Sequence, residues 1–182
     1  MRGLVMALLL LWAPQALAQG KDEQAVRAIV ATVYKGYARP EGLAGKPPKM
    51  SARLAAVEKE CAALGARLDK QEGDDSAYGT CSNDYDFFCQ CQDAFGIDFA
   101  KMKVDVAFPD PKRADAVLSW SGEGPDLKLM FVRGRGGWEL DDGWEYSQTE
   151  GGGVPSRRTR LTRDIGEMRA KLKLPAWKQP TR

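Results

Sequence analysis

The sequence has no histidine, and its 182 residues carry 27 Lys and Arg against 25 Asp and Glu. The absence of histidine excludes Ser-His-Asp and Cys-His catalysis and every metal site built on imidazole. The balanced charge argues against a general binder of nucleic acids or membrane surfaces. G-x-S-x-G, P-loop, dinucleotide and Cys-x-x-Cys patterns are also missing. The length suits one domain with its own hydrophobic core.

Long apolar runs are lacking too, except at the start of the chain. Arg2 precedes an apolar run at residues 4–13, Pro14 breaks it, and Ala16-Leu17-Ala18 fits the small-x-small cleavage rule. The sequence therefore predicts a signal peptide at residues 1–18, cleaved after Ala18, and a periplasmic or secreted protein. The alternative is a transmembrane anchor, but the run has about half of the roughly 20 residues that a span needs.

Four cysteines, Cys61, Cys81, Cys89 and Cys91, form an even set in a chain predicted to be exported, which favours two disulfide bonds. A Cys89–Cys91 bridge is disfavoured because one intervening residue poorly matches disulfide geometry. Cys61 is therefore expected to pair with Cys89 or Cys91, and Cys81 with the other. A soft-metal site of four thiolates and redox-active thiols are the alternatives.

Two amphipathic helices are predicted near the N-terminus. The first spans residues 22–38, with Asp22 as its cap and an apolar stripe at helical spacing: Val26, Ile29, Val30, Val33, Tyr34 and Tyr37. The second opens at Ser51 and ends near Gly73, with its stripe at Leu54, Val57, Cys61, Leu64 and Leu68. Both stripes are expected to face the core.

From residue 101 the apolar period changes to two, which indicates strands at residues 101–108, 114–120, 127–132 and 138–146. Their connections are too short for parallel crossovers, so an antiparallel meander is predicted. The string Arg-Gly-Arg-Gly-Gly at residues 133–137 is interpreted as a hairpin turn rather than as an RNA-binding motif. Ser156 or Thr162 is expected to cap a last helix whose inward residues are Leu161, Ile165, Met168 and Leu172.

These elements predict a single α+β domain at residues 19–174, followed by a C-terminal tail at residues 175–182. In it, N-terminal amphipathic helices pack on a curved antiparallel four-stranded meander, and a C-terminal helix follows. The acidic residues 74–86 are interpreted as a solvated loop. A calcium loop is disfavoured because Tyr85 stands where that motif needs an acid.

Helices followed by a curved antiparallel meander describe the NTF2-like (cystatin-like) α+β cone. Within that class the chain resembles DUF3828, a secreted bacterial family of unknown function. The resemblance extends over about residues 22–172 and is carried by the two N-terminal helices, Gln92-Asp93 after Phe87-Phe88, and Trp138-Glu139-Leu140-Asp141-Asp142. It implies the cone fold and brings no established activity.

Carboxylates are the remaining candidates for chemistry. The resemblance implies a cone with an open end, where enzymes of that fold often use an Asp-His pair. Without histidine, such chemistry would rest on Asp93, Asp141 and Asp142. Adjacent strand residues point to opposite faces, so Asp141 and Asp142 are not expected to form a dyad. Capping and turn hydrogen bonds are the favoured interpretation of all three.

Aromatic residues are the more suggestive feature. Trp120, Phe131, Trp138 and Trp144 fall on neighbouring predicted strands, where on one face they would form an apolar wall. Core packing under the helices is the favoured interpretation. A ligand pocket or partner surface is the alternative.

The sequence predicts neither an enzyme nor a cofactor or metal site. The leading hypothesis is a non-enzymatic periplasmic binding domain for a peptide, a small apolar ligand or another envelope protein, with no nucleic-acid partner and no membrane span. The second is a periplasmic immunity protein or inhibitor that neutralises a toxin or an envelope enzyme through residues 74–86. A hydrolase acting through carboxylates is the third.

Overall fold

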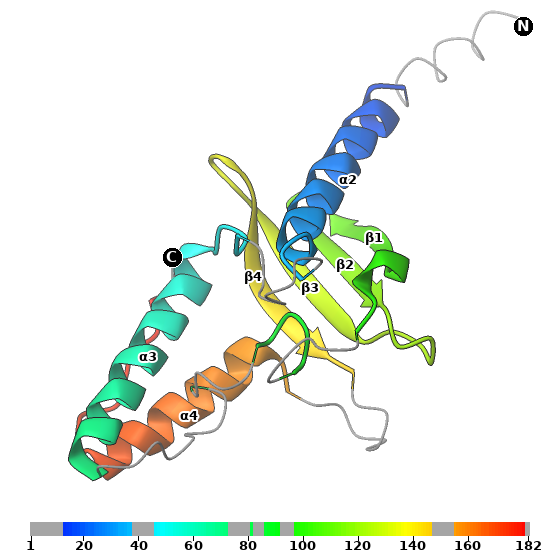
Figure 1. Ribbon diagram of the computed structural model, residues 1–182. Helices are drawn as coiled ribbons and strands as arrows, with labels where there is room; N and C mark the ends of the chain where they lie inside the picture. The colour runs from blue at the N-terminus through cyan, green and yellow to red at the C-terminus, as the bar shows by residue number, and fades with distance from the viewer. Residues whose placement is uncertain are drawn as a thin grey trace, which may run out of the picture.

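The computed structural model describes residues 13–37, 46–72, 81, 86–91, 97–146 and 155–180. Its elements are, in order, α2 (Ala13–Tyr34), α3 (Ala52–Glu72), the 3-10 helix η2 (Phe99–Lys101), β1 (Lys103–Asp110), β2 (Arg113–Ser119), β3 (Leu127–Gly134), β4 (Gly137–Glu145) and α4 (Arg157–Lys171). In Figure 1, α2 lies across the sheet, whereas α3 and α4 lie side by side beyond β4. The predicted α+β class is confirmed.

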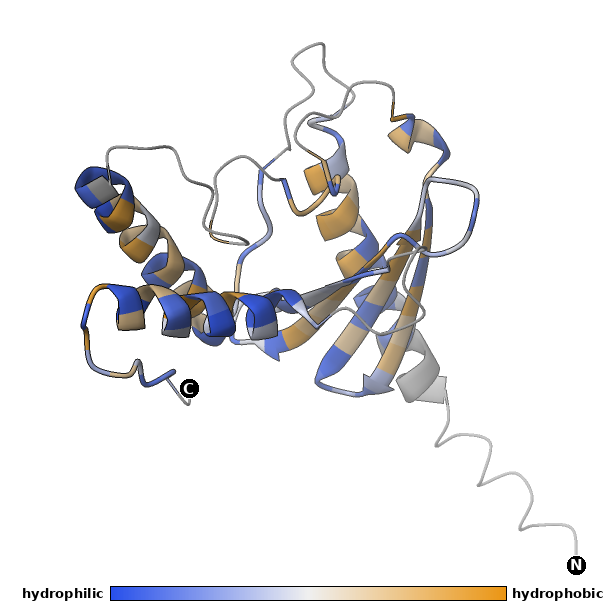
Figure 2. Cartoon of the chain, turned by 90° about the horizontal axis from the view of Figure 1, so that it is seen from below, coloured by the Kyte–Doolittle hydropathy of each residue, from blue (hydrophilic) through white to orange (hydrophobic). Residues whose placement is uncertain are grey.

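The sheet is a meander in which β1, β2, β3 and β4 are neighbours in sequence order and every pair is antiparallel. Apolar and polar residues alternate along its strands, as Figure 2 shows, and the residues of β2 and β3 that face α2 are fully buried. The Arg-Gly-Arg-Gly-Gly string forms the β3–β4 turn as predicted, and Gly137 there has φ +119°, a value that favours glycine. The strand predictions are thus confirmed to within a few residues.

A β-bulge interrupts β4 at Asp141. Met130 pairs with Asp142 while its neighbour Phe131 pairs with Leu140, which leaves Asp141 as the extra residue. Trp138 and Leu140 precede the bulge and face α2, whereas Asp142 and Trp144 follow it and lie on the other face, opposite Met130 and Lys128. The bulge therefore changes which residues of β4 share a face.

The main core lies between α2 and the sheet. Val26, Val30, Val33 and Tyr34 pack on the inward residues of the strands. However, α2 begins at Ala13 and not at the predicted cap Asp22, because the alanine- and glutamine-rich segment before Asp22 also favours helix and Pro14 is tolerated in a first turn. A cut after Ala18 would fall within α2. The signal peptide stays a prediction, since residues 1–12 lie outside the described part. In that part, no helix is long and apolar enough to cross a membrane.

A second, separate core lies between α3 and α4. Val57, Cys61, Leu64 and Leu68 of α3 pack there against α4, which contributes Leu161, Ile165 and Met168. Only Leu54, in the first turn of α3, joins the core of the sheet. The expectation that both N-terminal helices pack on the sheet is therefore right for α2 and wrong for most of α3. The inward stripe of α4 and its Ser156 cap are confirmed.

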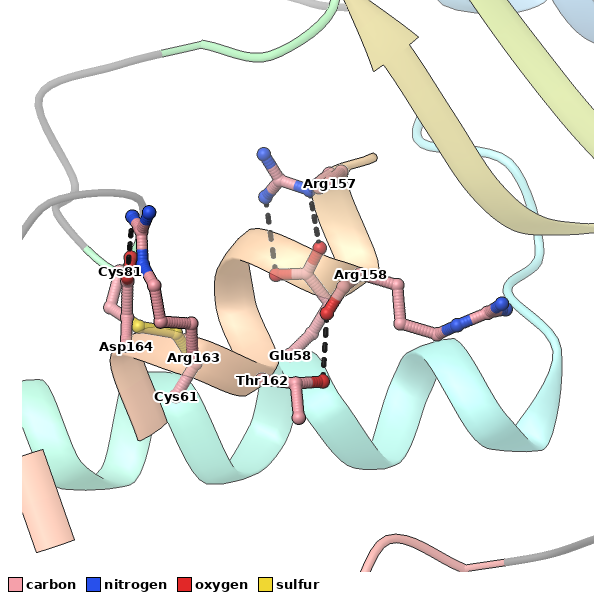
Figure 3. Close-up of a disulfide and its surroundings, with 8 residues drawn as sticks. All are labelled: Glu58, Cys61, Cys81, Arg157, Arg158, Thr162, Arg163 and Asp164. Atoms are coloured by element: carbon pink, nitrogen blue, oxygen red, sulfur yellow. Dashed lines mark hydrogen bonds and ion pairs between the residues drawn. A yellow bond between two sulfur atoms is a disulfide. The ribbon is translucent and has the colours of Figure 1, made fainter. Parts of the chain in front are cut away.

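Charged and covalent contacts hold α3 and α4 together. Arg157 Nε donates to Glu58 Oε1 at 2.6 Å, and Cys61 of α3 is bonded to Cys81, as Figure 3 shows. Arg169 forms a second ion pair with Glu60. Because Cys61 lies on the inward stripe of α3, the disulfide ties Cys81 directly to the second core.

The two disulfides confirm the number predicted but not the pairing. Cys61 pairs with Cys81, and Cys89 pairs with Cys91, so the four-thiolate metal site is not formed. The bridge across one residue is accommodated because Gln90 adopts a left-handed backbone with φ 55° and Asp86 pairs with Cys91 in a tight turn. These features bring the two Cα atoms within 5.2 Å.

Candidate functional site

The four aromatic residues of the predicted wall do not lie together. Phe131 and Trp138 are 1% and 6% exposed and belong to the core under α2. Trp144 lies on the opposite face, where Lys128 Nζ stands 5.8 Å from its ring, because the bulge at Asp141 reverses the alternation. The wall of four is therefore wrong, and core packing is confirmed for Phe131 and Trp138. Trp120 belongs to a different cluster of rings.

That cluster consists of Tyr34, Tyr37, Phe99 and Trp120 and is called the aromatic cluster below. The Tyr34 ring lies 5.1 Å from Phe99 and 6.1 Å from Trp120, while Phe99 lies 4.9 Å from Tyr37 and 5.5 Å from Trp120. The two tyrosines are buried, whereas Phe99 and Trp120 are half-buried. The cluster thus joins the core to the surface at the end of the sheet where β2 leads into β3.

Residues 86–91, called the disulfide loop below, are fastened to this cluster. Tyr37 Oη donates to Asp86 Oδ2 at 2.6 Å, and Tyr34 Oη donates to the carbonyl oxygen of Phe88 at 2.6 Å. Gln90 Nε2 donates to the carbonyl oxygen of Asp126 at 2.6 Å. Both tyrosines and the Cys89–Cys91 bridge therefore hold a rigid loop that presents the half-buried side chain of Phe88.

The surroundings of the two tyrosine hydroxyls keep them protonated, so that each can donate its hydrogen bond. Burial raises the pKa of Tyr34 far above its usual range, and the nearby carboxylates of Asp86 and Asp126 raise it further. Burial and the hydrogen bond to Asp86 do the same to the pKa of Tyr37. Neither hydroxyl loses its proton near neutral pH, so both remain hydrogen-bond donors to the disulfide loop.

Asp126 has a separate structural task in the turn between β2 and β3. Its Oδ2 accepts from the backbone amides of Trp120 at 2.6 Å and Ser121 at 3.0 Å. This carboxylate fixes the start of the turn and thereby the position of the Trp120 ring. The half-buried face of the aromatic cluster is thus set by backbone hydrogen bonds rather than by the ring contacts alone.

Asp141 is buried and fully engaged at the edge of β4. Its carboxylate accepts from Ser51 Oγ at 2.7 Å and from Arg158 Nη1 at 2.8 Å, and it pairs with the guanidinium of Arg53. Burial by itself raises the pKa of Asp141, but the hydrogen bonds from Arg53, Ser51 and Arg158 outweigh it, so the pKa lies below its usual value of 3.8. Asp141 is therefore an ionised structural anchor.

Asp142 is held next to it by the same arginine. Asp142 Oδ1 accepts from the backbone amide of Arg158 at 2.9 Å, and its Oδ2 lies 3.5 Å from Arg158 Nη2. Both acids are buried, since Asp141 is 7% exposed and Asp142 is 4% exposed. The bulge explains why both are buried, because side chains next to a bulge need not alternate between the two faces of the sheet. Asp142 accepts from the backbone amides of Gly143 and Arg158 as a capping residue would, whereas Asp141 instead pairs with the side chains of Arg53 and Arg158.

The remaining predicted site residues are placed only in part. Asp93 lies outside the described residues, as do residues 73–80 and 82–85 of the acidic loop. Within the described part, no group of three or more Cys, Asp or Glu side chains is arranged to hold a metal ion. No known protein family, no curated protein and no solved structure matches this chain. The resemblance to DUF3828 therefore stays a prediction.

Several residues of this region were not recognised as site residues from the sequence. Tyr34 and Tyr37 were assigned only to the apolar face of a helix, although their three-residue spacing already places two hydroxyls on one side of its last turn. Phe99, Gln90 and Arg158 carried no pattern of their own. Their roles depend on partners 16 to 65 positions away in the sequence, such as Asp142 for Arg158 and Tyr34 for Phe99.

Proposed function

We propose that this protein is an exported, non-enzymatic binding domain that holds an apolar segment of a peptide or envelope protein against the aromatic cluster and the disulfide loop. The observation that carries this proposal is a set of half-buried rings: Phe99 and Trp120 in the aromatic cluster, and Phe88 in the disulfide loop fastened to that cluster by Tyr34. Aromatic side chains lose little conformational entropy on binding and bury a large area, which makes such a surface suitable for a partner.

The chemistry of the buried groups supports a binding role over a catalytic one. Asp141 and Asp142, two of the three acids considered for a carboxylate hydrolase, are both held by Arg158, and Tyr34 and Tyr37 stay protonated. A general acid or base needs a pKa near the working pH and access to a substrate. The pKa of Asp141 is lowered from its usual value, which moves it further from neutral pH and makes this carboxylate less suited to proton transfer.

Two further features support the remaining parts of the proposal. Both disulfides are consistent with an oxidising compartment and hence with export. The packing of α2 across an antiparallel meander supports an NTF2-like cone as the specific fold. The same arrangement supports the resemblance to the DUF3828 family. The alternative of an immunity protein rests on residues 74–86, of which the structure describes only Cys81 and Asp86, so it stays a prediction.

Photo-crosslinking tests the proposed surface. A photoreactive amino acid is placed at Asp98 or at Ala100, two exposed positions on either side of Phe99, in the protein produced in its own cells. The expected result is a discrete crosslinked product from both positions and none from Glu167, an exposed position on α4. Mass spectrometry of the product identifies the partner.

A paired substitution separates the surface from the fold. Phe99→Ala is expected to abolish the crosslink, whereas Trp144→Ala removes a half-buried aromatic side chain from the opposite face and should leave the crosslink intact. Circular dichroism of both variants checks that they fold. Crosslinks that persist in folded Phe99→Ala, or that form equally from Glu167, contradict the proposal.

A further inference from the structure

The end of the sheet opposite the aromatic cluster gathers basic side chains. Two turns meet there: the β1–β2 turn carries Lys112 and leads into Arg113, and the β3–β4 hairpin carries Arg133 and Arg135. The backbone amide of Arg133 donates to the carbonyl oxygen of Lys112 at 2.9 Å, which fixes the two turns side by side. Four cations from distant parts of the sequence thus share one surface.

Two further segments add cations to this surface. Asp22 of α2 pairs with Arg133, which brings the preceding residue, Lys21, to the same end. Lys49 pairs with Glu139 of β4 and reaches the hairpin, where its Nζ lies 3.8 Å from the point at which Gly136 would carry a Cβ. The basic end is defined by these six exposed residues: Lys21, Lys49, Lys112, Arg113, Arg133 and Arg135.

The charge of the basic end exceeds the charge of the whole chain. Three carboxylates pair with its cations, namely Asp22 with Arg133, Glu139 with Lys49, and Asp110 with Arg113. Six cations against three anions leave +3, whereas the full sequence has +2. Lys21, Lys112 and Arg135 have no ion-pair partner among the described residues. The net charge of the whole chain therefore understates the positive potential at the basic end, because acidic residues elsewhere offset the charge of these cations.

We propose that the basic end binds the phosphate headgroups of an anionic membrane surface. Lysine and arginine side chains close to such a surface each contribute about 1 kcal/mol, and guanidinium groups bind phosphate oxygens in pairs. The cations lie on turn tips and exposed edges, so several reach a broad array of phosphates at once. This surface is distinct from the aromatic cluster, and the inference stands whether or not a partner binds there.

The position of α2 favours a membrane over an acidic protein as the partner. The apolar run at residues 4–13 precedes α2 in the sequence, and Asp22 places the first half of α2 at the basic end. Until the predicted cleavage after Ala18, the membrane that holds this run therefore lies on the side of the molecule where the cations gather. The charges alone would also attract an acidic protein, but such a partner would gain nothing from the position of α2.

Vesicle co-sedimentation of the protein that begins at Gln19, the product of the predicted cleavage, tests the proposal. Vesicles of phosphatidylglycerol mixed with phosphatidylcholine are compared with vesicles of phosphatidylcholine alone, at low and at high salt. Binding is expected only to the anionic vesicles and is expected to weaken as salt screens the charges. The variant that combines Lys112→Glu with Arg135→Glu should bind anionic vesicles at least about tenfold more weakly than the parent chain.

A matched variant controls for total charge. Lys59→Glu with Arg67→Glu makes the same change of net charge at exposed positions of α3, away from the basic end, and is expected to bind like the parent chain. If the glutamate pair at the turns disturbs folding, Lys112→Gln with Arg135→Gln provides a milder version. Thermal unfolding shows which variants fold.

Three outcomes would overturn the proposal. Equal binding to both vesicle types would assign the contact to apolar insertion. Undiminished binding by the folded turn variant would place the contact elsewhere on the protein. Binding to soluble inorganic polyphosphate without binding to anionic vesicles would assign the basic end to a soluble phosphate polymer instead.

Discussion

Ser51 Oγ donates a hydrogen bond of 2.7 Å to Asp141 Oδ1, and this contact joins the start of α3 to the bulge of β4. The same serine caps α3, since its Oγ accepts from the backbone amide of Leu54 at 3.1 Å. Arg158 adds the start of α4 to the same carboxylate. Asp141 is therefore the point at which the α3–α4 pair is fastened to the sheet.

Replacing Asp141 should destabilise the fold more than replacing any exposed acid. Asp141→Ala leaves Arg53 without its carboxylate and Arg158 with only the longer contact to Asp142, and it is expected to lower the free energy of unfolding by about 3 kcal/mol. Urea unfolding at neutral pH measures the change. Asp105→Asn, an exposed change on β1, is the control and should stay within about 0.5 kcal/mol of the parent chain. Equal effects of the two substitutions would contradict the anchoring role.

The pH dependence of stability should report the same carboxylate. The pKa of Asp141 is lower in the folded state than its usual 3.8, so ionised Asp141 stabilises the fold. This contribution is complete above the unfolded-state pKa and is lost as the pH falls through the folded-state pKa. The parent chain is expected to lose stability below about pH 4, and Asp141→Asn should lose less over the same interval. Urea unfolding midpoints measured at several pH values in this range check the prediction. If the midpoint falls with pH equally steeply in both proteins, the assignment to Asp141 is wrong.

Disulfide mapping checks the corrected pairing. Trypsin alone does not distinguish the pairings, because no Lys or Arg lies between Cys81 and Cys91. Chymotrypsin cleaves after Tyr85, Phe87 and Phe88 and separates Cys81 from the other two cysteines. A Cys61–Cys81 peptide pair and a separate Cys89–Cys91 peptide, lighter by two hydrogen atoms than its reduced form, are expected. A peptide linking Cys61 to residues 89–91 would restore the pairing first expected from the sequence.

Two glycines should respond to alanine with opposite signs. Gly143 of β4 lies under the ring of Phe87, and a Cβ there would collide with that ring, so Gly143→Ala is expected to cost about 1–3 kcal/mol. Gly166 of α4 is exposed with open space around it, so Gly166→Ala is expected to stabilise by about 0.5–1 kcal/mol. Thermal unfolding compares the two. Stabilisation by Gly143→Ala would mean that Phe87 does not occupy this position.

The sheet and the helical stripes were accessible from the sequence because each is a local pattern. Every inward position of β2 and β3 holds an apolar residue, which makes a period of two unmistakable, and the stripe from Leu54 to Leu68 marks α3 in the same way. What the stripe does not specify is its partner. α3 packs on the apolar stripe of α4, about 100 positions later in the sequence, and two ion pairs between glutamates of α3 and arginines of α4 border this core.

The candidate site was less accessible because it depends on two local irregularities. The bulge at Asp141 moved Trp144 to the other face and buried both Asp141 and Asp142, and it is held by Ser51 and Arg158 from other elements. The left-handed backbone of Gln90 permitted the Cys89–Cys91 bridge that the spacing rule disfavours. Neither irregularity leaves a trace in periodicity, because each is determined by tertiary contacts.

The last prediction concerns the free edge of β1, the outermost strand of the sheet. Arg27 of α2 donates through Nη1 to the carbonyl oxygen of Val104, where a second strand would otherwise bind. Val104, Val106 and Phe108 remain only half-buried along this strand, as does Met102 just before it. Edge strands with unpaired backbone groups and apolar side chains promote association between molecules. Arg27 thus protects the edge.

Arg27→Ala is therefore expected to form dimers or larger species as concentration rises, which sedimentation velocity measures. Arg67→Ala removes an exposed arginine from α3 and should sediment like the parent chain at every concentration. Arg27 also pairs with Glu23 at 2.8 Å, so Glu23→Ala, which leaves Arg27 in place, tests whether that pair alone matters. If Arg27→Ala and the parent chain sediment identically, then Pro109 and the charged side chains of β1 protect the edge without Arg27. If only Arg27→Ala associates, the guanidinium on Val104 is the group that keeps this edge from pairing.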